Sequence, residues 1–205
     1  MPFGLFSFHV LSLRSFGTTK TLKTSMSKKW QQEKASTATS MTGAVVGYWE
    51  DGHKTYKKSG LQARHLQGWQ RCQDLGVAAS YNVSGNNLLV RGGHTLQAVL
   101  EKSMVGQAGL KAIANGVRGV QQSLARGQIA HCDIKLKNVI VNWGSSDLSD
   151  PVVKLIDCDD AVAFGMPRTV VTPGVNGQPG DGQATSASTD VQGFIWILTA
   201  LNEGH

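Results

Sequence analysis

An aspartate, a lysine and an asparagine stand at fixed offsets in residues 129–141, between two apolar stretches that are typical of short strands. Asp133 can accept a proton from an attacking hydroxyl, and Lys135 can neutralise a phosphoryl group. Asn138 can offer its carbonyl oxygen to Mg²⁺, a hard cation that prefers oxygen ligands. The types and spacing of these side chains predict chemistry on a phosphate.

Residues 131–138 resemble the catalytic loop of protein kinases, H-R-D-L-K-x-x-N, at seven of eight positions when Ile134 is accepted for Leu. Cys132, which replaces the Arg, is the one departure. The resemblance implies that Asp133 and Lys135 are catalytic, that Lys135 and Asn138 contact the nucleotide, and that Asn138 binds the metal ion.

Two later segments resemble kinase motifs in the expected order. Asp157 follows a predicted strand, residues 151–156, and matches the Mg²⁺-binding Asp of D-F-G, with Cys158 and Asp159 in place of Phe and Gly. Aspartate tolerates the left-handed backbone of that glycine better than most residues do. Residues 186–198 resemble the helix that opens S-x-D-V-x-x-F. The resemblance implies that Asp190, which matches the Asp of this motif, hydrogen-bonds the backbone of the catalytic loop and has a structural role.

A β-hairpin is predicted before these motifs, because Asp-Gly at residues 51–52 separates two strand-like stretches. In a kinase the second strand of this hairpin carries the lysine that holds the ATP α- and β-phosphates. The resemblance therefore implies Lys57 or Lys58 in that role, and strand alternation places only one of them toward the nucleotide. A helix predicted over residues 61–75 contains no Glu to pair with it, and no G-x-G-x-x-G loop precedes the hairpin.

Apolar periodicity predicts the clearest helix over residues 103–126. One stripe is formed by Leu110, Ile113, Val117, Val120 and Leu124. Kinases place such a helix before the catalytic loop. The resemblance as a whole implies an α+β, protein kinase-like fold, with a reduced β-rich N-lobe (residues 41–93) and an incomplete, mostly helical C-lobe (residues 94–205).

Charge and cysteine content limit the classes of protein that the sequence fits. Of the net charge of +6, residues 1–71 hold 11 Lys and Arg against 3 Asp and Glu, but no nucleic-acid motif accompanies them, so no nucleic-acid partner is expected. Residues 1–40 are typical of a disordered basic tail or of an organellar transit segment. Three cysteines without C-x-x-C spacing favour a reducing compartment, here the cytoplasm, and no apolar run predicts a membrane span.

The function implied by the resemblance is that of an ATP-dependent protein Ser/Thr kinase with ATP and Mg²⁺ as cofactors. Asp133 would deprotonate a Ser or Thr hydroxyl of a protein substrate, Lys135 would steady the γ-phosphate, and Asn138 and Asp157 would hold Mg²⁺. In many kinases the Arg at the position of Cys132 makes bidentate hydrogen bonds to a phosphate on the activation segment, which here would follow Asp160 and run to Gly182. Cys132 cannot make these bonds. Activity is therefore expected not to depend on phosphorylation of the candidate acceptors Thr169, Thr172 and Thr185. Arg168 is the alternative cation, but it lies inside the segment itself and is a poor anchor for it.

Two alternatives stay open. The missing glycine loop and helix glutamate favour a pseudokinase or inactive fragment that binds nucleotide or protein. A metal-dependent phosphoesterase would use carboxylates that converge on metal ions. The residues available for it are Asp133, Asp157, Asp159 and Asp160.

Overall fold

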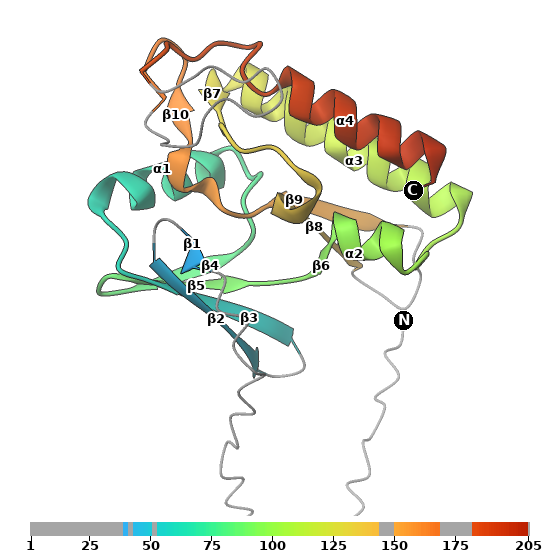
Figure 1. Ribbon diagram of the computed structural model, residues 1–205, viewed down its shortest axis with the longest axis horizontal. Coiled ribbons are helices and arrows are strands. Elements are labelled where there is room, and N and C mark those ends of the chain that lie inside the picture. The colour runs from blue at the N-terminus through green and yellow to red at the C-terminus, as the bar shows by residue number, and fades with distance from the viewer. Residues whose placement is uncertain (1–38, 41–42, 51–52, 144–149, 169–181, 205) are drawn as a thin grey trace, which may run out of the picture.

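The computed structural model describes residues 39–40, 43–50, 53–143, 150–168 and 182–204, with side chains described from Thr55 onward. Figure 1 shows a sheet at one end of the molecule and the long helices α3 and α4 side by side at the other. The helices are α1 (Ala63–Asp74), α2 (Leu96–Glu101), α3 (Gln107–Arg126) and α4 (Val191–Glu203), with the short 3₁₀ turns η1 (Leu136–Asn138) and η2 (Cys158–Asp160). The strands are β1 (Thr39–Ser40), β2 (Gly43–Glu50), β3 (His53–Ser59), β4 (Tyr81–Ser84), β5 (Asn87–Arg91), β6 (His94–Thr95), β7 (Ile129–Ala130), β8 (Val139–Trp143), β9 (Pro151–Leu155) and β10 (Val162–Ala163).

Strands β1 to β5 form one antiparallel sheet in the order β1-β2-β3-β5-β4. The predicted hairpin is confirmed, because Glu50 pairs with His53 across a two-residue connection. Strand β3 lies in the middle of the sheet, and its side chains alternate between the two faces. Lys58 is buried and Lys57 is only half-buried, so the two lysines point in opposite directions.

Helix α1 begins two residues later and ends one residue earlier than the sequence predicts. Its buried side has the i, i+3, i+4, i+7 spacing of a helix face, with His65, Gly68, Trp69 and Cys72. This side packs against η2, and a Cβ atom at Gly68 would collide with the backbone carbonyl oxygen of Cys158. Glycine at this position therefore permits the close approach of the helix to the turn.

Gly68→Ala is expected to destabilise the protein by about 1–3 kcal/mol, because the added methyl group must displace backbone atoms of η2. Gly119→Ala on α3 is the matched control, since a Cβ there meets no atom within 4 Å. That variant should gain up to about 1 kcal/mol from helix propensity. Urea denaturation of both variants measures the difference, and equal stabilities would mean that α1 does not lie this close to η2.

Helix α3 carries the predicted apolar stripe, and all five of its residues are buried against β9 and α4. The helix begins at Gln107 and not at residue 103, because Ser103 has a left-handed backbone (φ 46°) that helix geometry does not accept. The stripe forms the centre of the helical half of the molecule. Three of the largest fully buried side chains there are Ile113, Phe194 and Ile197.

Ile113→Ala is expected to cost about 2–5 kcal/mol of unfolding free energy, since the fully buried side chain would leave a cavity. Gln122→Ala, on the exposed side of the same helix, should change it by less than about 0.5 kcal/mol. Two variants with the same denaturant midpoint would place the stripe outside the core.

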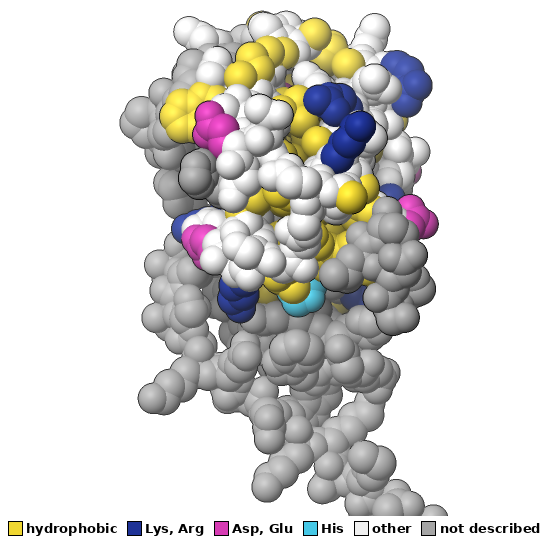
Figure 2. All heavy atoms as spheres, turned by 90° about the vertical axis from the view of Figure 1, so that its right-hand side faces the viewer, with side chains coloured by type: hydrophobic (Ala, Val, Ile, Leu, Met, Phe, Trp, Pro, Cys, Tyr) yellow, Lys and Arg dark blue, Asp and Glu magenta, His cyan; other side chains and the backbone are white. Residues whose placement is uncertain are grey.

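The outer side of α4 exposes apolar side chains, with Ile195 and Trp196 at 50% and 58% exposure. Figure 2 faces the end of the molecule that carries α2, where hydrophobic side chains form separate patches among polar, Lys and Arg side chains. Within the described ranges, no helix combines the length and apolar character needed to cross a membrane.

Candidate active site

The loop between β7 and β8, residues 131–138, is called the Asp133 loop below. The Lys135 ammonium donates to Asp133 Oδ2 over 2.6 Å, and Asn138 Nδ2 donates to the same oxygen over 2.7 Å. Asn138 Nδ2 also donates to the backbone carbonyl of Asp133, 2.9 Å away. The structure thus brings the three residues together around one carboxylate, whose side chain keeps 32% of its surface exposed.

Asp190 holds the start of this loop from the N-terminal end of α4. Its Oδ2 accepts from the His131 amide over 2.6 Å, and its Oδ1 accepts from the Cys132 amide over 2.9 Å. The expected structural role of Asp190 is therefore confirmed. Burial raises the pKa of this carboxyl, although the two N–H donors favour its ionised form.

Cys132 has a left-handed backbone (φ 68°), which costs free energy for a residue with a Cβ. Both of its backbone polar groups are held, the amide by Asp190 and the carbonyl by Arg168 Nη2 at 2.9 Å. Its thiol is fully buried, and burial raises the thiol pKa to about 12. Cys132 thus contributes to the loop through its left-handed backbone and its two backbone hydrogen bonds, and its protonated thiol is unreactive.

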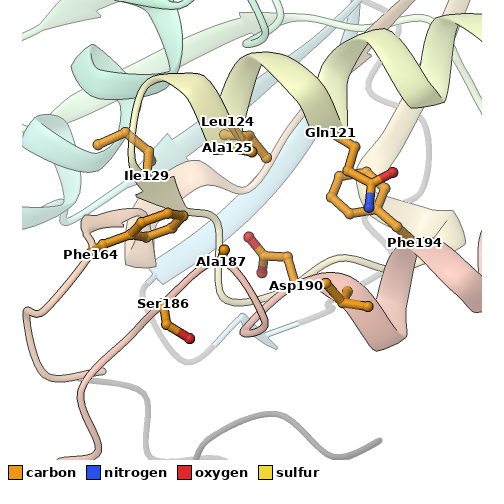
Figure 3. Close-up of a pocket in the computed structure, with 10 residues that line it drawn as sticks. Gln121, Leu124, Ala125, Ile129, Phe164, Ser186, Ala187, Asp190 and Phe194 are labelled. Atoms are coloured by element: carbon orange, nitrogen blue, oxygen red, sulfur yellow. The ribbon is translucent and has the colours of Figure 1, made fainter.

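A small cavity of about 50 Å³ lies beside this support, between the end of α3, β7 and the start of α4. Figure 3 shows the Asp190 carboxylate among the lining residues, with Leu124 and Ala125 on one side and Ser186 on the other. The lining residues do not include Asp133 or Asp157. The cavity therefore belongs to the support of the loop and not to the cluster of polar side chains.

His131 connects the Asp133 loop to the end of β9. Its Nδ1 accepts from the Asp133 amide over 3.4 Å, so its Nε2 carries the proton and donates to the Ile156 carbonyl at 3.2 Å. The Ile156 amide in turn donates to the Asn138 carbonyl over 2.9 Å. These bonds fix the position of Asp157, the next residue, relative to Asp133.

Lys58 extends from β3 of the sheet to the carboxylates of Asp157 and Asp159. Its ammonium donates to Asp157 Oδ1 over 2.6 Å and also to Asp159 Oδ2. Burial alone would lower the pKa of Lys58, but the attraction of the two carboxylates outweighs it and the pKa is raised. For Asp157, burial would raise the pKa, and the nearby ammonium lowers it instead. The structure brings Lys58, not Lys57, to Asp157, and phosphate binding by either lysine stays a prediction.

The left-handed backbone expected at Asp159 is found at Asp157 (φ 61°, ψ 44°). Asp159 lies inside η2 and does not have the left-handed backbone that was expected from the glycine of D-F-G. Cys158, in the place of Phe, is fully buried against Cys72 of α1, and burial raises the pKa of its thiol.

Three of the four carboxylates named for the phosphoesterase alternative, Asp133, Asp157 and Asp159, have side-chain partners in the protein. Asp159 is 4% exposed, and its two oxygens are bonded to Lys58 and to the indole N–H of Trp69. Burial raises the pKa of Asp160, with the neighbouring Asp159 as the next contribution. Among the described residues, no group of three or more His, Cys, Asp or Glu side chains is arranged to hold a metal ion.

Of the three candidate phosphate acceptors, only Thr185 lies within the described residues. Thr185 is 3% exposed, and its hydroxyl lies 2.9 Å from the Ala163 carbonyl oxygen and 3.0 Å from that of Met166. A buried hydroxyl that donates to a backbone carbonyl is not accessible as a phosphate acceptor, and independence of transfer from Thr185 phosphorylation stays a prediction. Thr169 and Thr172 lie outside the described residues.

The fold is similar to that of a protein kinase. A solved structure of the Cydia pomonella granulovirus kinase PK-1 matches with a TM-score of 0.56, over 85% of this chain and 68% of that chain, at 14% sequence identity. No family model matches the chain, and no curated protein matches its sequence. The chain therefore has a mixed α/β, protein-kinase-like fold, as the sequence motifs predicted.

Proposed function

We propose that the chain is a protein kinase-like phosphotransferase that moves the γ-phosphoryl group of ATP to a Ser or Thr hydroxyl of a protein. The observation that supports this most is the meeting of Lys58 with Asp157 at 2.6 Å, at a strand end that His131 ties to the Asp133 loop. Lys58 and Asp157 are 99 residues apart in the sequence. Their contact brings the lysine proposed for the phosphates next to the aspartate proposed for the metal ion, close to the proposed general base.

The side chains present fit a Mg²⁺ ion. Asn138 uses its amide nitrogen on Asp133, which leaves its carbonyl oxygen for a cation, and the Asp157 side chain is 38% exposed. Oxygen ligands of this kind suit Mg²⁺, which when bound would neutralise charge on the phosphates. Asn138 and Asp157 are the residues that would hold the ion.

Charge neutralisation and positioning are the contributions of the remaining residues. Asp133 would take the proton of the attacking hydroxyl, because its carboxylate is partly exposed and oriented by two donors. Lys135, with a half-exposed side chain, would move from Asp133 to the transferring phosphoryl group. Lys58 would exchange Asp157 for a nucleotide phosphate while Asp157 turns to the metal ion.

Transfer of labelled γ-phosphate from ATP to dephosphorylated casein or myelin basic protein tests this function. The purified chain is expected to label Ser or Thr in at least one of the two when Mg²⁺ is present, and to label neither in EDTA. Binding of Mg²⁺·ATP without any transfer would instead favour the pseudokinase alternative. Absence of both binding and transfer would contradict the proposal.

Transfer is expected not to require phosphorylation of the segment that follows Arg168. Arg168 is buried and donates to the Cys132 carbonyl, and Cys132 has no cationic group for a phosphate. The double variant Thr169→Ala/Thr172→Ala should therefore keep its transfer rate within a few-fold of the parent rate. A loss of about a hundredfold that acidic replacements restore would contradict this, since phosphate-dependent ordering has that behaviour.

A further inference from the structure

The two carboxylates that bind Lys58 differ in their surroundings. The Asp157 side chain is 38% exposed, whereas that of Asp159 is 2% exposed. Asp159 Oδ2 accepts from Lys58, and Asp159 Oδ1 accepts from Trp69 Nε1 over 2.7 Å. Asp157 is thus able to exchange its partner for a solvent ion, and Asp159 is held in place on both sides.

Trp69 is the contribution of α1 to this cluster. Its ring is 1% exposed and packs edge-on against Tyr81, with 5.3 Å between the ring centroids. The side of α1 that faces η2 carries no acidic residue. The helix therefore supplies a neutral N–H donor where the sequence comparison with kinases expected a glutamate, and the acid comes from η2 itself.

Building on the proposed function, we propose that Asp159 is the positioning acid for Lys58 and that Trp69 fixes the Asp159 carboxylate. The contact of α1 with η2 then determines where the nucleotide lysine points. When Asp157 turns to Mg²⁺, Asp159 keeps the ammonium in place, because its own ion pair with Lys58 is buried and its second oxygen is held by Trp69. Asp159 touches neither nucleotide nor acceptor in this scheme and acts only through Lys58.

The first experiment needs no nucleotide. The indole N–H signal of Trp69 is followed by ¹⁵N NMR in the parent chain and in the Asp159→Asn and Lys58→Met variants. Both changes should shift this signal and speed its hydrogen exchange, because they alter the acceptor or its charge. The signal of Trp143, a half-buried tryptophan whose indole N–H has no acceptor among the described residues, should stay in place. An unchanged Trp69 signal in both variants would overturn the proposal.

The second experiment measures Mg²⁺·ATP binding by calorimetry. Asp159→Asn is expected to weaken binding by about tenfold or more, as the loss of a buried charge-assisted hydrogen bond does. It should also raise the Mg²⁺ concentration needed, since Lys58 then competes with the ion for Asp157. Trp69→Phe should weaken binding about threefold, and the double variant should bind no more weakly than Asp159→Asn alone, because Trp69 acts through Asp159.

Trp143→Phe is the matched control and should bind Mg²⁺·ATP as the parent does. If Asp159→Asn does not fold, the weaker Mg²⁺·ATP binding expected of Trp69→Phe is the test. Parent-like binding and Mg²⁺ dependence in both Asp159→Asn and Trp69→Phe would overturn this inference and leave the proposed function intact. No binding by the parent chain would overturn the proposed function, and with it the role given to Asp159.

Discussion

Asp133→Asn is expected to lower the rate of phosphoryl transfer by about a hundredfold to ten-thousandfold, the usual contribution of a general base, while Mg²⁺·ATP still binds as to the parent. The amide has nearly the same size as the carboxylate and still accepts from Asn138 and Lys135, so the loop should keep its shape. The lost property is the ability to take a proton. A fall in kcat with an unchanged KM for ATP is the expected kinetic form.

Asp157→Asn provides the contrast, because Asp157 is assigned to the metal ion and not to the hydroxyl. Calorimetry should show Mg²⁺-dependent ATP binding weakened by about tenfold or more in this variant, since a charged ligand of a hard cation is lost. Equal effects of the two substitutions on nucleotide binding would contradict the separate roles of Asp133 and Asp157.

Lys58→Met is expected to abolish measurable Mg²⁺·ATP binding and to destabilise the chain by about 3 kcal/mol, since removing one partner leaves a buried charge uncompensated. Most of this loss comes from Asp159, which is 4% exposed. Asp157 contributes less, because its side chain is more than a third exposed and solvent screens it. Urea denaturation measures the stability and calorimetry the binding.

The difference in stability between the parent and Lys58→Met should depend on pH. The pKa of Asp157 lies below its usual 3.8, so its stabilising interaction with Lys58 is complete above that pH and is lost as the pH falls further. The pKa of Lys58 lies above its usual 10.5, so the interaction is complete below that pH and is lost as the pH rises through the raised pKa. The stability difference between the parent and Lys58→Met should therefore be constant from about pH 5 to 9, and it should become smaller as the pH falls below the usual pKa of Asp157.

Lys57→Met serves as the matched control, because Lys57 is the neighbouring residue on β3 and points to the other face of the sheet. It should leave both stability and nucleotide binding near those of the parent chain. A larger effect on binding from Lys57→Met than from Lys58→Met would assign the nucleotide lysine to the other side of β3.

The parts of the site that the sequence predicted are local in the chain. Asp133, Lys135 and Asn138 lie within six residues, and the turn η1 brings them around one carboxylate oxygen. The stripe of α3 and the hairpin of β2 and β3 follow from spacing alone. Spacing patterns of this kind depend on residues that are close in the sequence, and for this reason the structure agrees with these predictions.

The contacts of Lys58 with Asp159 and of Trp69 with Asp159 could not be predicted in the same way. These pairs are 101 and 90 residues apart, and nothing in the local sequence links them. The lack of a glutamate in α1 indicated a weakened nucleotide site. The structure places an acidic partner of Lys58, Asp159, on η2, and close packing at Gly68 brings α1 against this turn.

Calorimetric titration of ATP into the purified chain tests the central claim, a Mg²⁺·ATP site formed by Lys58, Asn138 and Asp157. The account predicts saturable binding in Mg²⁺ that falls by at least about tenfold in EDTA and disappears in Lys58→Met, since the metal ion and the lysine both neutralise phosphate charge. The same titration with Lys57→Met should resemble that of the parent. Absence of binding by the parent chain, or binding that neither EDTA nor Lys58→Met reduces, would contradict the account.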